Sequence, residues 1–252
     1  MKGILIDVSK CIGCGACREA CRVQNNLPES NDTDLSARTY TVVKTTGEVN
    51  YRRMCMHCLD PTCASVCPVG AFRKTAAGPV VYAAERCMGC RYCMVACPFS
   101  VPRYEWDKPL PLVQKCNMCA DRVGAGGAPA CAEACPTGAT AFGERTELIR
   151  EARARIVAEP VKYVNRVYGR DEVGGTSVLY LSTVPFERLG LQTDLDQKPL
   201  PLLTFRVLSK IPHLVALGSV ALGGVWWITN RRAEVARAEN GNKRQNGQGG
   251  GR

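Results

Sequence analysis

Sixteen cysteines carry the most evident chemistry in this 252-residue sequence. They fall into four groups of four, and none is left over. The most regular group has gaps of two, two and three residues, followed by Pro98: Cys87, Cys90, Cys93 and Cys97. The others vary this spacing: Cys11, Cys14, Cys17 and Cys21; Cys55, Cys58, Cys63 and Cys67; and Cys116, Cys119, Cys131 and Cys135. Thiolates at such gaps are typical ligands of 4Fe–4S clusters.

A cubane cluster needs four thiolates that approach from different directions, so a single loop supplies only three of them. In two-cluster ferredoxins the last cysteine of each run binds the other cluster. We apply this exchange to the inner two groups and then to the outer two. It predicts four clusters, each named here by its first cysteine: the Cys11 set (Cys11, Cys14, Cys17, Cys135), the Cys55 set (Cys55, Cys58, Cys63, Cys97), the Cys87 set (Cys87, Cys90, Cys93, Cys67) and the Cys116 set (Cys116, Cys119, Cys131, Cys21).

Disulfide bonds and structural zinc are the alternative uses of these cysteines. Three cysteines within seven residues would crowd if each reached a separate disulfide partner. Zinc prefers two pairs of ligands, and the group from Cys116 to Cys135 fits such a site when it is taken alone. Because the two regular groups match the cluster spacing, we interpret all four groups as cluster ligands.

Other residue types in these groups fit the same interpretation. Gly13 and Gly15 permit the positive φ angles that bring backbone amides close to sulfur. His57 lies inside a group that already has four thiolates, so we expect it behind the ligands or at the surface. Positive charge beside a cluster favours its reduced form. Four basic residues fit that role and fit equally well as solvated charges: Arg86, Arg91, Lys115 and Arg122.

The formal net charge of +10 could indicate a nucleic-acid partner. Each oxidised cubane with four thiolates adds about −2, so four clusters reduce the net charge to about +2. Residues 230–252 alone hold six Lys/Arg and two Glu, a formal charge of +4, so the cluster-bearing part is near neutral or slightly negative. We therefore predict no nucleic-acid partner. Because aromatic residues make up only 6% of the chain, we expect the clusters to replace much of the core.

Short apolar segments predict the elements that position these loops. We expect strands at 3–7, 80–82, 139–142 and 177–181, and a hairpin at 39–44 and 48–52. Residues 146–159 predict a helix with Thr146 as its N-cap and Pro160 after its end. The predicted fold class is α+β. Two ferredoxin-like units form a domain at 1–145, with the inner unit, about 54–100, inserted in the outer one.

The C-terminal third predicts an arm and a membrane anchor. Residues 146–210 are expected to form the helix and an extended arm that contacts partner subunits. Residues 211–229 hold no formal charge apart from His213 and span roughly 28 Å as a helix, close to the thickness of a bilayer core. A buried helix of a soluble protein is the alternative. Residues 230–252 predict a basic, disordered tail.

Basic residues are in excess after this span, which favours a cytoplasmic tail and a cluster domain on the periplasmic face of a bacterial inner membrane. The first residues show neither a secretion signal nor a twin-arginine motif. Three interpretations stay open: the protein remains inside, it is exported folded with a partner that carries the signal, or a leader has been removed.

The sequence resembles the four-cluster iron–sulfur β subunits of membrane-bound bacterial formate dehydrogenases and of related nickel–iron hydrogenases. The similar stretches are 5–14, 34–42, 55–58, 97–102 and 173–176. The resemblance implies a large catalytic subunit on one side and an integral membrane subunit that binds quinone or haem on the other. It also implies export of the folded protein on the twin-arginine signal of a partner.

We therefore predict a non-catalytic electron-transfer subunit with no catalytic residues of its own. It would relay electrons between the catalytic subunit and the membrane subunit of a respiratory complex. Two alternatives remain: a β subunit of a molybdopterin reductase with reversed electron flow, and a freestanding polyferredoxin. The proposed anchor separates the last of these from the others.

Overall fold

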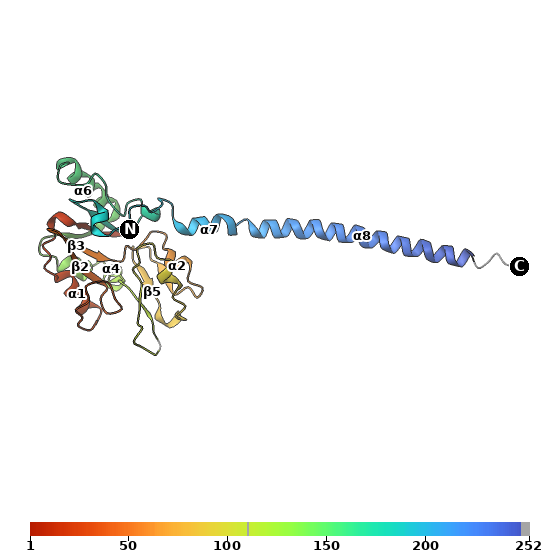
Figure 1. The fold of residues 1–252 in the computed structure, drawn as a ribbon, viewed down its shortest axis with the longest axis horizontal. Helices are drawn as coiled ribbons and strands as arrows, with labels where there is room; N and C mark the ends of the chain where they lie inside the picture. Colours follow the sequence, from red (N-terminus) through yellow and green to blue (C-terminus); the bar gives the residue numbers. More distant parts are fainter. Residues whose placement is uncertain (110, 248–252) are drawn as a thin grey trace. The chain divides into compact units, whose positions relative to one another are not determined.

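A three-stranded sheet brings together segments that lie far apart in the chain, at residues 2–7, 140–144 and 178–181. The computed structural model describes residues 1–109 and 111–247 (Figure 1). The strands of the sheet are β8 (Thr140–Glu144), β1 (Lys2–Asp7) and β9 (Val178–Leu181), in that order. Strand β1 (Lys2–Asp7) pairs antiparallel with β8 (Thr140–Glu144) and parallel with β9 (Val178–Leu181). Because β1 is central and covered on both faces, its residues from Gly3 to Asp7 are all buried.

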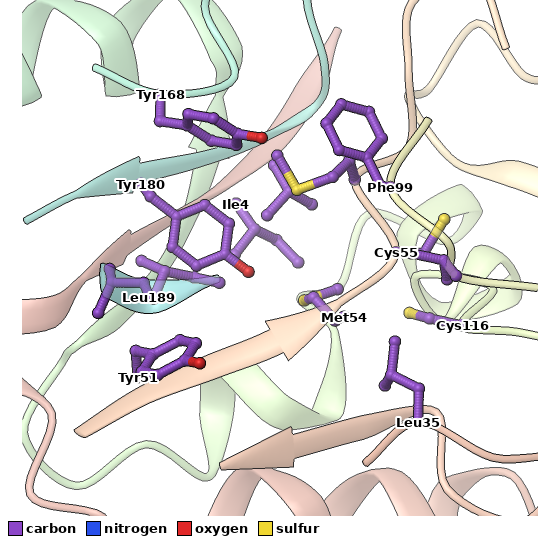
Figure 2. Close-up of a cluster of buried hydrophobic side chains, with 14 of the residues drawn as sticks. Ile4, Leu35, Tyr51, Met54, Cys55, Phe99, Cys116, Tyr168, Tyr180 and Leu189 are labelled. Atoms are coloured by element: carbon purple, nitrogen blue, oxygen red, sulfur yellow. The ribbon is translucent and has the colours of Figure 1, made fainter. Parts of the chain in front are cut away.

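The two faces of this sheet belong to different parts of the core. On one face Leu5 packs with helix α6 (Arg145–Ala158) through Leu148 and Ala152. On the other face Ile4 belongs to the largest apolar cluster, which also includes the fully buried Tyr180. Figure 2 shows Met54 and Phe99 of this cluster beside Cys55 and Cys116. The apolar core therefore extends up to the cysteines.

Three two-stranded hairpins and several short helices form the other regular structure within Met1–Pro201, the first of two compact units. The hairpins are β2–β3 (Thr41–Thr46, Val49–Met54), β4–β5 (Phe72–Lys74, Val80–Tyr82) and β6–β7 (Arg103–Tyr104, Val113–Gln114). The α-helices are α1 (Ala16–Gln24), α2 (Thr62–Ser65), α3 (Tyr92–Val95), α4 (Ala120–Gly124) and α5 (Ala130–Glu133). The 3-10 helices are η1 (Val8–Lys10), η2 (Ala84–Arg86), η3 (Glu172–Gly174) and η4 (Phe186–Leu189).

The structure agrees with the predicted strands and hairpin but moves the start of the predicted helix. Helix α6 begins at Arg145 with Glu144 as its N-cap residue, so Thr146 lies inside the first turn. Glu144 ends strand β8, and its carboxylate is held by the Lys2 ammonium at 2.8 Å. The pairing of β8 with β1 therefore fixes where the helix starts.

The segment after α6 differs from the predicted extended arm. The apolar strand β9 is fully buried, and it lies in the sheet beside β1. The chain divides into two compact units, Met1–Pro201 and the part from Leu202 onwards. Residue 145, where the first domain was expected to end, lies within the first unit. Four consecutive apolar side chains gain more from burial on both faces of a sheet than from an exposed path.

Replacing Leu179 with alanine tests the role of β9. Leu179 is 0% exposed and packs against the face covered by α6. Loss of this side chain should lower the free energy of unfolding by about 3 kcal/mol, because a buried leucine leaves a cavity. Guanidinium unfolding followed by circular dichroism measures the change. The control is Val157→Ala on α6, where the side chain is 80% exposed and little change is expected. Equal effects would contradict a core role for β9.

The second unit is helical. It holds most of α7 (Leu200–Leu208) and all of α8 (Ile211–Gly247). By length and composition the helical stretch Leu200–Glu239 is apolar enough to cross a membrane, and none of its most apolar window is buried. Many of its large apolar side chains are exposed, including Leu217, Val220 and Trp226.

The predicted disorder from residue 230 differs from the structure, in which α8 continues to Gly247. Residues 231–239 are rich in Arg, Glu and Ala, which favour helices. Arg231 also pairs with Glu234 three residues later at 3.2 Å, and Asn230 donates to the same carboxylate. The last part of the predicted tail, 248–252, lies outside the described residues.

Candidate metal centres

The four cysteines of the Cys11 set line one cavity. Cys11 and Cys14 come from the loop between η1 and α1, Cys17 from the first turn of α1, and Cys135 from the segment between α5 and β8. Gly13 has a φ of +76°, and a Cβ atom there would lie 2.8 Å from the Asn50 side-chain oxygen. Glycine is therefore required where this loop passes the β2–β3 hairpin.

The cysteines of the Cys55 set line a second cavity, together with His57 and Lys115. The imidazole of His57 is fully buried, and its Nδ1 accepts a hydrogen bond from the Val80 amide at 2.9 Å. The ring proton therefore lies on Nε2, which has no hydrogen-bond partner within the described parts of the chain. Burial lowers the pKa of His57 well below its usual value, and the charge of Lys115 adds to the effect.

The cysteines of the other two sets also lie near one another. Burial raises the pKa of Cys93 to about 11, and its neighbours Cys87, Cys90 and Cys67 add to the rise. The Cys116 set shows the same effect. Burial raises the pKa of Cys21 to about 12, and Cys131 and Cys119 contribute. Each predicted exchange of the fourth cysteine is therefore compatible with the geometry, and the ligand sets remain proposals.

These surroundings fit a cofactor that needs several thiolates at once. At Cys21 and Cys93, burial and the neighbouring thiols resist the loss of the thiol proton, so bound iron would have to hold these thiolates deprotonated. None of the sixteen cysteines forms a disulfide bond. Across the described residues, no three His, Cys, Asp or Glu side chains converge tightly enough for a single metal ion. His57 lines the Cys55 cavity, and its Nε2–H has no partner among the described residues. This group could donate a hydrogen bond to a sulfur of a bound cluster.

The basic residues expected beside the cysteine loops differ in their surroundings. Lys115 is a buried residue of the Cys55 cavity, and its ammonium donates to the carbonyls of Val80 and Cys116. The guanidinium of Arg91 lies over the rings of Tyr104 and Trp106, 5.2 Å and 5.0 Å from their centroids. Both distances are within the usual range of cation–π contacts. Arg122 forms an ion pair with Glu133 at the surface.

Sequence reasoning missed Arg52 and Lys74. Arg52 is 2% exposed and reaches the sulfur of Cys131. The Lys74 ammonium donates to the His57 carbonyl at 2.8 Å, and burial lowers the pKa of Lys74 to about 8. Their position in hairpin strands next to the cysteine loops was the only sequence signal.

Comparison with protein-family models identifies the class of protein to which this chain belongs. Two overlapping stretches, residues 10–71 and 49–145, match models of the 4Fe–4S dicluster domain. Together they contain all sixteen cysteines. The cysteine-lined cavities thus belong to a 4Fe–4S dicluster protein, and iron–sulfur clusters are its cofactors.

Relatives that align over most of this chain define its family more closely. The chain is 37% identical to the hydrogenase-2 operon protein HybA of Escherichia coli O157:H7 over 237 residues, 75% of this chain and 72% of that protein. It is 35% identical to the formate dehydrogenase iron–sulfur subunit of Haemophilus influenzae over 245 residues, 88% of this chain and 78% of that one. The nitrate-inducible formate dehydrogenase iron–sulfur subunit of Escherichia coli K12 is 39% identical over 197 residues, 70% of this chain and 66% of that subunit. The chain belongs to this family of iron–sulfur subunits, which confirms the resemblance seen in the sequence.

Proposed function

We propose that this chain relays electrons through four 4Fe–4S clusters between a large catalytic oxidoreductase subunit and an integral membrane subunit that binds quinone or haem. The observation that carries the proposal is the combination, in one chain, of four neighbouring sets of cysteines and an exposed apolar helix. The related hydrogenase and formate dehydrogenase proteins support a respiratory complex. We propose no catalytic residue.

Each bound cluster would accept and release single electrons. The protein residues hold the thiolates and set their surroundings. In the Cys55 set, Cys55 is buried and Cys58, Cys63 and Cys97 are partly buried, which limits access of water. In the Cys11 and Cys87 sets, by contrast, Cys14 and Cys90 are exposed.

Three exposed apolar residues close to the exposed Cys90 in the chain support a protein partner. Around it along the chain, Met88 is 65% exposed, Tyr92 56% and Val95 84%. Large apolar side chains that are exposed near a ligand loop favour an interaction site there. We therefore propose that a partner subunit covers the Cys87 set and exchanges electrons there.

The proposed location is a bacterial inner membrane, with the first unit on the periplasmic face and the C-terminal end of α8 in the cytoplasm. The apolar stretch within Leu200–Glu239 supports the membrane part. The excess of basic residues after Thr229 supports the orientation.

The test is purification of the native complex in detergent, with mass spectrometry of its subunits and an iron count. We expect about sixteen iron atoms per copy of this chain, together with a large catalytic subunit and a membrane subunit. A protein that is well folded but iron-free would refute the cofactor assignment. A cluster-loaded protein that is found only alone and in solution would favour the freestanding polyferredoxin.

A further inference from the structure

Arg52, on strand β3, is a buried cation with an unusual set of partners. Its Nε donates to the Thr41 hydroxyl at 2.8 Å and its Nη1 to the Thr140 hydroxyl at 3.3 Å. Its Nη2 contacts the sulfur atoms of Met54 at 2.6 Å and Cys131 at 3.0 Å. Among the described residues, these hydrogen-bond partners of the guanidinium include no carboxylate.

The same guanidinium belongs to the surroundings of two ligand sets. Arg52 lines the cavity of the Cys11 set, and it donates to Cys131, a member of the Cys116 set. Burial raises the pKa of the Cys17 thiol, and the charge of Arg52 is the largest influence that opposes this rise. One positive charge therefore acts on both outer sets at once.

A fully buried guanidinium without a counter-charge is strongly unfavourable. A cubane with four thiolates is an anion, and its negative charge grows on reduction. Clusters in the two outer sets would supply the missing counter-charge. In return, the cation would stabilise the reduced form of each cluster more than the oxidised form.

We propose that Arg52 is the shared counter-ion and hydrogen-bond donor of the Cys11 and Cys116 clusters and raises the reduction potential of both. This inference rests on the proposed function, because it requires clusters in these sets. The proposal predicts that substitution of Arg52 shifts the reduction potentials of the Cys11 and Cys116 clusters. The potentials of the Cys55 and Cys87 clusters should stay unchanged.

The experiment is a redox titration of the purified complex, followed by electron paramagnetic resonance. In Arg52→Met, which removes the charge but keeps an unbranched side chain, we expect two of the four clusters to become harder to reduce. The one-electron equilibrium constant for each should fall at least about tenfold, which corresponds to about 59 mV. Arg52→Lys keeps the charge but not the forked donors, so its shift should be smaller.

The matched control is Arg53→Met, one residue further along the same strand. Arg53 lies 3.9 Å from the Asp34 carboxylate and is partly exposed, so its loss should leave the outer pair unchanged. Unchanged potentials in Arg52→Met, or equal shifts of all four clusters, would overturn the inference. If Arg52→Met does not assemble its clusters, Arg52→Lys decides: full iron content supports the charge role, and an equal loss of iron overturns it.

The parent protein separates this inference from the proposed function. Four clusters in the parent with no response to Arg52 would refute only the role of this residue. A parent without clusters would refute the electron-transfer proposal itself.

Discussion

A Cys135→Ser protein is expected to lose about four of about sixteen iron atoms per chain, and to lose electron transfer through the complex. Cys135 lines the same cavity as Cys11, Cys14 and Cys17. Burial opposes ionisation of its thiol, but hydrogen bonds from Thr140 and Thr137 outweigh this effect and lower the pKa of Cys135. A serine hydroxyl does not ionise at neutral pH, so it would not replace this thiolate as a ligand.

The measurement is the ratio of iron to protein, with electron paramagnetic resonance of the reduced complex to identify the missing cluster. Cys21→Ser is the matched control, because it removes the fourth ligand proposed for the other outer cluster. We expect each variant to lose a different signal. If Cys135→Ser kept the Cys11 cluster and lost the Cys116 cluster, the proposed exchange of ligands would be wrong.

The second large effect is expected from ending the chain after Pro201. When the chain is expressed without partner subunits, this truncation should reduce the membrane-bound fraction at least about tenfold, because membrane insertion of an apolar helix is effectively irreversible. The first unit should still fold, since the sheet and its apolar clusters lie within residues 1–201. The fraction left in membranes after an alkaline wash measures the effect.

A second truncation, after Glu239, separates the apolar span from the basic residues that follow it. This chain keeps the whole stretch that is long and apolar enough to cross a bilayer. It should therefore stay in the membrane as the full chain does. Equal release of both truncated proteins, or of neither, would refute Leu200–Glu239 as the anchor.

The elements that the sequence predicted well are those with a strong local signal. The strand at 3–7 is a short apolar run, and it forms β1. The predicted hairpin forms β2 and β3, because Gly47 supplies the positive φ of its turn. The cysteine groups were visible from spacing alone, and their identity as 4Fe–4S motifs is confirmed by the dicluster-domain matches.

The features that sequence reasoning missed depend on contacts between distant residues. The place of β9 beside β1 is a pairing across more than 170 positions, and nothing local to residues 178–181 indicates it. The burial of Arg52 also depends on distant residues, because its partners Thr140 and Cys131 lie 88 and 79 positions further along the chain. A run that contains Arg52 and Arg53 gives no local sign that only one of them is enclosed.

The central place of β1 also sets an order of events during synthesis. This strand is made well before both of its neighbours in the sheet, because β8 and β9 are made after residue 139. Contacts between such distant segments are slow to form. The proposed inner pair of clusters has all its ligands once Cys97 is made, whereas the outer pair waits for Cys135. A strand that is made early is therefore among the last to gain its partners in the sheet.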